Sequence, residues 1–394
     1  MATLEIAENV YSVGTINWDL RCFDSIMPTP RGSSNNAYLI KGSEKTALID
    51  TGEPHDETDF ITNLMRLNLD SLDYIVCLHA EQDHSGLLPL MLEVYPMAKV
   101  VTNEVCKGLL MAMHHLEELE ERFIVIGDKE TLSLGDKMLK FHLAPWVHWP
   151  DTMFAEIVED KILFTSDFLS THYASPTLFQ DDNSPDYLEG VKRYYAAIMM
   201  PFRASVREQL ANVEEIAPVI IGPSHGPVLK LPAKIMDLYH DWASDTPKNL
   251  VVVAYVSMHG STKMMVDFLV DDLVQRGIPV HQYNLLNTDS GVLGSSLVEA
   301  ATIIIATPTV LYGPHPVAVN AAYLVRALRP KAKYLSVIGS FGWATNAVNY
   351  LAEMLEPLGA EILEPVYIKG LPNEATISDL HKLADSIEER HKTL

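Results

Sequence analysis

The sequence predicts a two-domain protein that combines α/β and α+β architecture, and three observations support this fold class. The chain has 394 residues, enough for two or three domains, and 48% of them are hydrophobic, which suffices for substantial cores. Up to about residue 240, short strands and helices follow one another in a mixed order, with strands that cannot all be parallel. From about residue 250, strands and helices alternate regularly, which predicts a doubly wound parallel sheet.

Short apolar runs bounded by turn residues predict the strands of the first domain. One run ends in Asp50-Thr51-Gly52, and the run at residues 73–78 leads directly into a cluster of polar residues. Strands are expected at residues 10–14, 36–40, 46–50, 73–79, 124–126, 139–143, 162–164 and 219–221, and helices at residues 57–69 and 86–95.

A polar stretch with a proline, residues 242–248, predicts a linker between the domains. We therefore expect one domain at residues 1–248 and a second at residues 249–394. In the second domain we expect strands at residues 250–256, 279–283, 302–306, 334–339 and 362–368, and a helix at residues 262–276.

Composition excludes several classes of function and location. The net charge of -23 repels nucleic acid and anionic membranes. No apolar run reaches the roughly 18 residues that a membrane span needs, and the N-terminus shows no secretory signal pattern. The three cysteines, Cys22, Cys77 and Cys106, form no CxxC pair, so we expect small core residues in a reduced, cytoplasmic compartment.

The stretch from His79 to Gly86 carries the strongest chemical signal. It follows an apolar strand, and alternating side chains of an extended chain point the same way, so His79, Glu81 and Asp83 can converge. Burying these groups together is unfavourable unless a cation compensates. A solvated acidic turn is the alternative, and the position directly after an apolar strand disfavours it.

Three further candidates stand at predicted strand ends or in loops: His148, Asp167 and His225. A single histidine is usually a satisfied core or surface group. Several candidates at successive strand ends of one sheet indicate a shared site, because functional residues collect on the loops at one edge of a scaffold.

The order of these residues, beginning with Asp50-Thr51-Gly52 and His79-x-Glu81-x-Asp83-His84, resembles the metallo-β-lactamase fold, an αββα sandwich that holds two metals. The hydrolases of that fold use His-x-His-x-Asp-His, a set suited to zinc. Here Glu81 replaces the second histidine, which is the mark of the flavodiiron proteins and suits two non-heme irons. The resemblance implies six metal ligands: His79, Glu81, Asp83, His148, Asp167 and His225.

The resemblance also assigns roles around the expected diiron centre. Asp167 would bridge the two irons, and His84 would stand outside the ligand set as a catalytic neighbour. The segment matching residues 19–25 and the pair Tyr194-Tyr195 would line the pocket, with Tyr195 as a catalytic residue. Some members of the family have histidine where this chain has Asp24, which changes the available proton donor.

The second domain opens with a strand, a loop rich in hydroxyls and glycine, and a helix N-terminus, a pattern typical of phosphate binding. A hydroxyl-rich helix cap is the alternative for this loop alone. Two later loops support a cofactor site, because ligands bind at the carboxyl ends of strands in open α/β sheets. The expected cofactor residues are Ser257, Met258, His259, Gly260, Ser261, Thr262, Pro308, Thr309, Val310, Leu311, Tyr312, Gly313, Ser340, Phe341, Gly342, Trp343 and Ala344.

This arrangement resembles flavodoxin, which binds FMN, and Ser340-Phe341-Gly342-Trp343 looks like the flavodiiron version of the third loop. His259 departs from the flavodoxin pattern, which usually has threonine there. The resemblance places Trp343 near both flavin and irons, as a catalytic residue. A core aromatic is the alternative for this tryptophan.

The resemblance implies an oxidoreductase that relays electrons through FMN to a diiron centre and reduces dioxygen to water, nitric oxide to nitrous oxide, or both. It also implies rubredoxin or another electron donor and a head-to-tail homodimer or dimer of dimers. The absence of a CxxC pair argues against a rubredoxin domain in this chain. Two alternatives remain: a zinc-dependent hydrolase with a fused flavodoxin-like domain, and an electron carrier with a purely structural metal site.

Overall fold

The computed structural model describes residues 4–394, which divide into two compact units. Unit 1 comprises residues up to Tyr195 together with Phe202–Asp241, and unit 2 comprises Ala196–Pro201 together with Trp242–Leu394. This division lies close to the linker expected at residues 242–248, where helix α7 (Ala233–Ala243) ends and strand β18 (Lys248–Tyr255) begins.

Unit 1 contains two main sheets. Both are mixed, because each contains parallel as well as antiparallel pairs of strands. The first sheet has the order β1 (Leu4–Ala7), β2 (Val10–Ser12), β7 (Tyr38–Lys41), β8 (Thr46–Ile49), β9 (Tyr74–Val76), β10 (Lys99–Thr102), β11 (Phe123–Val125). The second has the order β12 (Thr131–Ser133), β13 (Met138–Leu143), β14 (Met153–Ile157), β15 (Ile162–Ser166), β16 (Ile220–Pro223), β17 (Leu229–Lys230).

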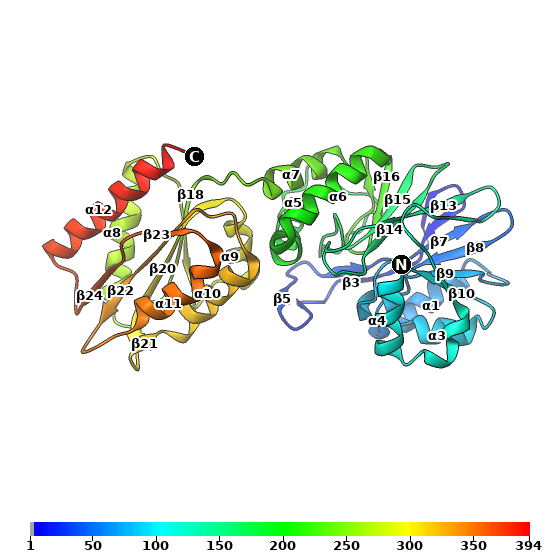
Figure 1. Cartoon of the computed structure of the whole chain (residues 1–394), viewed down its shortest axis with the longest axis horizontal. Coiled ribbons are helices and arrows are strands. Elements are labelled where there is room, and N and C mark those ends of the chain that lie inside the picture. Colours follow the sequence, from blue (N-terminus) through cyan, green and yellow to red (C-terminus); the bar gives the residue numbers. More distant parts are fainter. Residues whose placement is uncertain (1–3) are drawn as a thin grey trace. The chain divides into compact units, whose positions relative to one another are not determined.

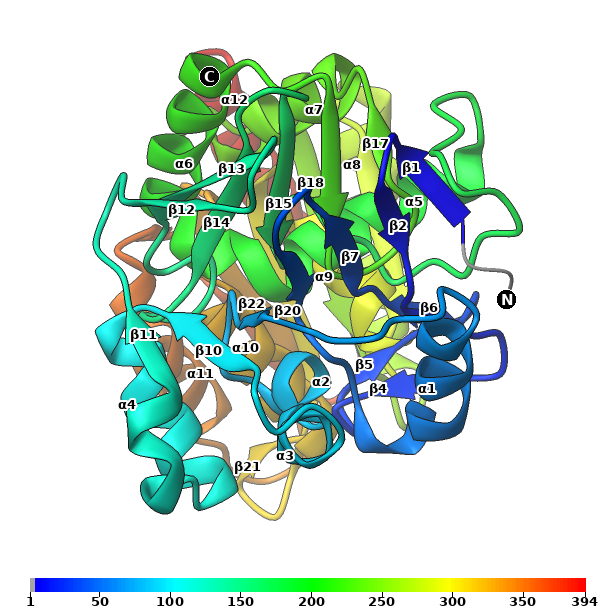
Figure 2. The same ribbon diagram turned by 90° about the vertical axis from the view of Figure 1, so that its right-hand side faces the viewer.

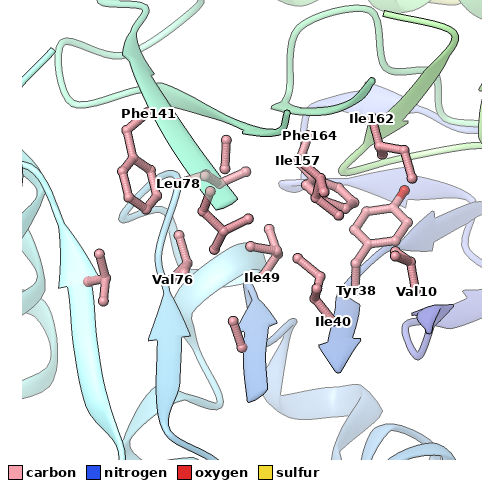
Figure 3. Close-up of a cluster of buried hydrophobic side chains, with 14 of the residues drawn as sticks. Val10, Tyr38, Ile40, Ile49, Val76, Leu78, Phe141, Ile157, Ile162 and Phe164 are labelled. Atoms are coloured by element: carbon pink, nitrogen blue, oxygen red, sulfur yellow. The ribbon is translucent and has the colours of Figure 1, made fainter. Parts of the chain in front are cut away.

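The core of unit 1 lies between these sheets. Alternate side chains of β7, β8 and β9 point inward and meet side chains of β13 to β15, because successive residues of a strand face opposite sides. Figure 3 shows Ile40, Ile49 and Val76 in this layer together with Phe141 and Phe164. The other faces of β7 to β9 carry Leu39, Leu48 and Ile75, which form a second core with helices.

Helices cover the outer faces, which completes an αββα sandwich (Figures 1 and 2). The helices over the first sheet are α1 (Glu57–Met65), α3 (Leu88–Val94) and α4 (Glu104–His114), and those over the second are α5 (Pro185–Tyr194), α6 (Arg203–Ile216) and α7. Short elements complete the unit: α2 (Gln82–Ser85), η1 (Pro54–Asp56), η2 (Glu117–Arg122), and the strand pairs β3 (Thr15–Asn17) with β6 (Ser33–Asn35) and β4 (Cys22–Phe23) with β5 (Met27–Pro28). A π-helical turn, η3 (Tyr195–Met199), and η4 (Met200–Phe202) follow α5.

Unit 2 is a parallel sheet with helices on both faces. Its order is β19 (Val280–Asn284), β18, β20 (Ala300–Val310), β22 (Tyr334–Phe341), β23 (Glu361–Ile362), with β24 (Val366–Lys369) on β22 and β21 (Gly313–Pro314) antiparallel to β20. Helices α8 (Ser261–Gln275) and α12 (Glu374–His391) cover one face, and α9 (Ser290–Leu297), α10 (Pro316–Leu328) and α11 (Ala347–Leu355) the other, with η5 (Glu356–Leu358) after α11 (Figure 1). The continuous apolar runs of β18 and β20 follow from burial on both faces.

Two expectations are corrected. The strand expected at residues 362–368 is split into β23 and β24. Pro365 lies between them and interrupts the strand, because it has no N–H for a sheet hydrogen bond. Cys22 is exposed, whereas Cys77 and Cys106 are buried as expected. Among the helices of residues 4–394, none has the length and apolar character that crossing a bilayer requires.

Candidate metal centre and cofactor loops

The candidate ligands of unit 1 follow strands of both sheets. His79 follows β9, Asp167 follows β15, and His225 follows β16. His148 lies in the loop that joins β13 to β14. Since β15 and β16 run parallel, their carboxyl ends lie at the same edge of the second sheet.

The chain does not stay extended through the motif at residues 79–86. After Glu81 it turns into α2, so Asp83 and His84 lie on a helical turn and not on a continued strand. The expectation that His79, Glu81 and Asp83 share one small volume by strand alternation is therefore wrong. The structure instead separates them into two neighbouring groups of donors.

The first group brings together His79, Glu81, His148 and Asp167, with one ligand atom from each within 4.8 Å of the others. Oε2 of Glu81 lies 3.1 Å from Nε2 of His79 and 3.3 Å from Nε2 of His148. Oδ2 of Asp167 lies 3.3 Å from Nε2 of His148. Two imidazoles and two carboxylates thus face one another at distances that suit the binding of one metal ion.

The second group brings together Asp83, His84 and His225. Oδ2 of Asp83 lies 3.3 Å from Nε2 of His84 and 3.1 Å from Nε2 of His225. His84 therefore points into the cluster, and its Nε2 is placed as closely as that of His225. This arrangement differs from the expectation that His84 stands outside the ligand set.

Asp167 lies between the two groups. Its Oδ2 approaches His148 on one side and lies 3.2 Å from Nε2 of His84 on the other, while its Oδ1 lies 3.2 Å from Nε2 of His225. The side chain of Asp167 is 2% exposed. A carboxylate in this position offers one oxygen to each of two adjacent cations.

The pKa shifts within the cluster are those expected of a site that binds cations. Burial raises the pKa of Asp167, but the imidazoles of His84, His148 and His225 outweigh it and hold that pKa well below its usual range. Burial lowers the pKa values of His148 and His225, but the facing carboxylates raise each to about 9. Without metal, the carboxylates thus retain protons on the imidazoles, where bound cations would take their place.

Hydrogen bonds from surrounding residues fix the orientation of the imidazoles. Both carboxylate oxygens of the buried Asp151 lie within 3.2 Å of Nδ1 of His79, and Oδ2 accepts a hydrogen bond from the backbone N–H of Ala80 at 2.8 Å. Nδ1 of His225 donates to the backbone oxygen of Ser34 at 2.7 Å. Both contacts leave Nε2 free to face the cluster, which is the usual arrangement of metal-binding histidines.

Of the predicted tyrosine pair, only Tyr194 contacts the cluster. Its hydroxyl donates a hydrogen bond of 2.9 Å to Oδ1 of Asp167. Tyr195 is buried and packs against Tyr239 with ring centroids 5.1 Å apart, so Tyr194 is the member of the pair that is bonded to Asp167, and a catalytic role of Tyr195 stays a prediction. Neighbouring residues of a helix point about 100° apart, and only one of the two can face the site.

The three expected cofactor loops of unit 2 meet at the carboxyl ends of the central strands. Oγ of Ser261 and Oγ of Ser340 form a hydrogen bond of 2.5 Å, which joins the first loop to the third. Oγ1 of Thr309 and Oγ1 of Thr345 lie 2.7 Å apart, which joins the second to the third. Residues 308–310 and 340–341 are still part of β20 and β22, so these loops are shorter than expected.

A turn with unusual backbone angles presents an aromatic ring beside the third loop. Leu311 and Tyr312, with φ of 46° and 76°, form the turn between β20 and β21. The ring of Tyr312 is within 20° of parallel to that of Trp343, with centroids 6.4 Å apart. Trp343 is 75% exposed and is therefore no core aromatic.

Both sets of residues fit the groups that the sequence indicates. In unit 1, Asp83 Oδ1, His84 Nε2 and Asp167 Oδ2 are buried without a hydrogen-bond partner among residues 4–394, as expected of metal-facing atoms. In unit 2, Oγ1 of the buried Thr262 likewise has no partner, and it lies in the first turn of α8, where helix N–H groups attract phosphate. The exposed rings of Tyr312 and Trp343, in the other two loops, suit a flat ring.

Sequence analysis missed Asp151 as a supporting residue. Its signal was its place three residues after His148, in Trp149-Pro150-Asp151, but a single aspartate in a loop gives no indication of its hydrogen-bond partner.

Comparison with known proteins gives two family matches that together span most of the chain. Residues 33–226 match the family described as ODP family beta lactamase, and residues 253–382 match flavodoxin. The two matches correspond to units 1 and 2.

Two of the similar proteins align with the chain over nearly their whole length. A flavo-diiron protein of Clostridium acetobutylicum is 32% identical over 98% of both chains, and a nitric oxide reductase of Moorella thermoacetica is 31% identical over 98% of both. The structure of the rubredoxin oxygen:oxidoreductase of Desulfovibrio gigas superimposes with a TM-score of 0.94, at 27% identity and over 99% of both chains.

Proposed function

Since this chain belongs to the flavodiiron proteins, we propose that it receives electrons at FMN and uses them at a non-heme diiron centre to reduce dioxygen to water, nitric oxide to nitrous oxide, or both. The observation that carries this proposal is the position of Asp167 between two groups of imidazole and carboxylate donors. A zinc-dependent hydrolase is disfavoured, because the relatives are oxidoreductases and Glu81 stands where the hydrolases have histidine.

The proposed ligands are His79, Glu81 and His148 for one iron, Asp83 and His225 for the other, and Asp167 for both. We add His84 as a further donor to the second iron, because its Nε2 lies 3.2 Å from Asp167 Oδ2. Bound to these oxygen-rich sets, two irons supply one-electron redox chemistry beside each other, and FMN supplies electron storage in the other unit.

The side chains around the centre orient the metal ligands and hold or deliver protons. Asp151 and Ser34 hold two imidazoles with Nε2 facing inward. The O–H of Tyr194 donates a hydrogen bond to Oδ1 of Asp167, and this bond stabilises the ionised form of the carboxylate. Burial, followed by the charges of Glu81 and Asp83, raises the pKa of Asp24 to about 6, so this acid can deliver protons near neutral pH.

We further propose the domain bounds, the electron donor, the assembly and the location of the protein. Residues 1–248 form the diiron domain, and residues 249–394 form the FMN domain. Rubredoxin is the proposed electron donor, which the name of the Desulfovibrio relative supports. The active form is a head-to-tail homodimer, alone or as a dimer of dimers, in which the exposed Trp343 of one copy passes electrons to the irons of the other. The free cysteines fit a cytoplasmic location.

The decisive experiment separates substrate reduction from cofactor binding. Protein from iron-replete medium should hold about two irons and one FMN, and after anaerobic reduction it should be reoxidised by dioxygen or nitric oxide in separate stopped-flow runs. Asp167→Ala should abolish both reactions and leave FMN content unchanged, because the flavin loops lie in unit 2. Stoichiometric zinc, or full turnover by the variant, would contradict the proposal.

A further inference from the structure

Tyr367 of β24 reaches across a neighbouring strand to the end of β20. In the sheet of unit 2, Gly339 of β22 pairs with Thr307 of β20 on one side and with Tyr367 on the other. The hydroxyl of Tyr367 nevertheless donates a hydrogen bond of 3.0 Å to the backbone oxygen of Thr307. The tyrosine side chain therefore lies over β22 at the position of the glycine.

The position of Gly339 requires a residue without a side chain. A Cβ atom at this position would collide with the backbone oxygen of Thr307 and would lie 2.7 Å from Cε2 of Tyr367. A glycine allows this close approach, and any other residue would displace the tyrosine. The ring of Tyr367 also lies within 10° of parallel to that of Phe341, with centroids 6.2 Å apart. These contacts hold the tyrosine in one place.

Tyr367 belongs to a chain of hydroxyl groups that links the second cofactor loop to the third. Its oxygen lies 2.9 Å from Oγ1 of Thr309, which in turn lies 2.7 Å from Oγ1 of Thr345. Oγ1 of Thr345 accepts a hydrogen bond of 3.1 Å from the N–H of Ala347, the first residue of α11. The chain thus runs from the start of α11, through both loops, to β24.

The carbonyl at one end fixes the direction of this chain. A carbonyl oxygen can only accept, so Tyr367 donates its hydrogen to Thr307. Because each hydroxyl has a single hydrogen, Thr309 then donates to Tyr367, and Thr345 donates to Thr309. Burial raises the pKa of Tyr367, which keeps this hydroxyl protonated. Hydrogen bonds that run in one direction strengthen one another.

The chain sets the spacing of the two loops that carry exposed aromatic rings. Tyr312 stands beside the second loop and Trp343 in the third, and the N–H of Asn346 donates to the backbone oxygen of Tyr312 at 2.7 Å. This backbone bond and the hydroxyl chain join the same two loops at consecutive residues of the third. A loop that is held in its binding conformation loses less conformational freedom when the ligand binds, which increases the affinity.

We propose that Tyr367 is a positioning residue of the flavin site, which holds the second and third loops, through Thr309 and Thr345, in the conformation that binds the flavin ring. This inference rests on the proposed function, in that it requires a flavin at these loops. The hydroxyl chain does not include the loop before α8, where the phosphate is expected. Substitution of Tyr367 should therefore affect FMN and riboflavin equally.

The test measures flavin affinity with and without the hydroxyl of Tyr367. The full-length chain is stripped of flavin and titrated with FMN or with riboflavin, and the quenching of flavin fluorescence gives the dissociation constants. Tyr367→Phe keeps the ring, and it should weaken the binding of both flavins by the same factor, about two- to tenfold, the value of one neutral hydrogen bond. Tyr323→Phe, in an exposed tyrosine of α10, is the matched control and should weaken neither.

A second pair of variants tests the chain itself. Thr345→Val removes a hydroxyl and should weaken both flavins, whereas Thr345→Ser keeps the hydroxyl and should bind them as the wild type does. The double variant of Tyr367→Phe and Thr345→Val should weaken binding by less than the product of the two single effects, because the second change acts on a chain that is already broken.

The outcomes separate this inference from the proposed function. Unchanged flavin affinity in Tyr367→Phe would overturn the inference, even if thermal unfolding shifts, because the tyrosine would then only stabilise the sheet. Weakening of FMN alone would overturn it too, since the effect would lie at the phosphate. Single effects that multiply in the double variant, or Thr345→Ser as weak as Thr345→Val, would show that the hydroxyls do not act as one chain and would overturn it likewise. A wild-type chain that binds neither flavin would overturn the proposed function itself.

Discussion

The carboxylate of Asp151 holds His79 by its outer nitrogen, with both oxygens within 3.2 Å of Nδ1. The same carboxylate accepts the backbone N–H of Ala80, and Asn103 donates to the backbone oxygen of Asp151 at 2.6 Å. The loop that carries His148 is thereby tied to the loop that carries His79. One buried aspartate sets both the tautomer of a ligand and the distance between two ligand loops.

Asp151→Ala should weaken iron binding at the group of His79 and His148 by about 10- to 100-fold, because the imidazole loses the partner that fixes its orientation. Iron content and chelator competition measure the effect. Asp379→Ala, in an exposed aspartate paired with Lys382, is the control and should change neither. Unaltered iron affinity in Asp151→Ala would show that His79 is oriented by other contacts.

Tyr194→Phe should lower iron affinity, and Tyr195→Phe should not. The first change removes the hydrogen bond to Asp167, which as a bond to a charged group is worth about 1.5–3 kcal/mol. Tyr195 stands next to it in the chain and packs on Tyr239, so it is a closely matched control. Chelator competition on both variants decides, and a larger effect from Tyr195→Phe would restore that residue to the site.

Much of this site could be predicted from the sequence, and the exceptions have physical causes. The sequence allows four ligands to be predicted, because each stands at or near the end of a recognisable strand: His79, His148, Asp167 and His225. The separation of Asp83 from His79 and Glu81 could not be predicted, because nothing in the sequence shows that the chain becomes helical after Glu81.

The choice between Tyr194 and Tyr195 depends on the phase of a helix that passes into a π-helical turn at Tyr195, and this phase is set by packing. Strand order and apolar runs predict the mixed sheets of unit 1 and the parallel sheet of unit 2, whereas the αββα sandwich is implied by the resemblance of the ligand motif. The split of the last strand depends on Pro365, which has no N–H for a sheet hydrogen bond.

The stability of the metal-free protein should fall as the pH rises from about 6.5 to 9. His148 and His225 have pKa values raised to about 9 in the folded chain, against about 6.5 when unfolded. Their protonated forms therefore stabilise the fold fully below the unfolded value, and this contribution is lost as pH rises through the folded value. The expected loss is of the order of 1–3 kcal/mol.

Urea unfolding at three pH values measures this loss. The iron-loaded protein is the control, because its imidazoles bind metal without protons and should show no such decrease. A metal-free protein with stability that is constant or increases over this range would contradict the charge distribution described for the cluster.

Leu311→Asn should stabilise unit 2 by about 1 kcal/mol, because leucine in the left-handed region is strained and asparagine tolerates it. Leu311 is 94% exposed, so little packing is lost. Leu311→Ala removes the same side chain but keeps the strain, and it should not stabilise. Thermal unfolding of the flavin-free protein compares the two, and equal midpoints would show that the turn is unstrained.

Mixed dimers should recover activity from two inactive variants if the flavin of one copy serves the irons of the other. Asp167→Ala retains the FMN loops and loses the proposed bridge. Ser261→Asp retains the ligand cluster, and its carboxylate in the first turn of α8 favours the helix but repels a phosphate. Neither variant alone should turn over.

After co-expression with two affinity tags, random pairing makes half of the dimers mixed. In a head-to-tail arrangement each mixed dimer has one competent pair, the FMN of the Asp167→Ala chain with the irons of the Ser261→Asp chain. The mixture should therefore show about a quarter of wild-type activity, and purified mixed dimers about half. Electron transfer within a single chain would leave both preparations inactive, because each chain lacks one of its own two centres.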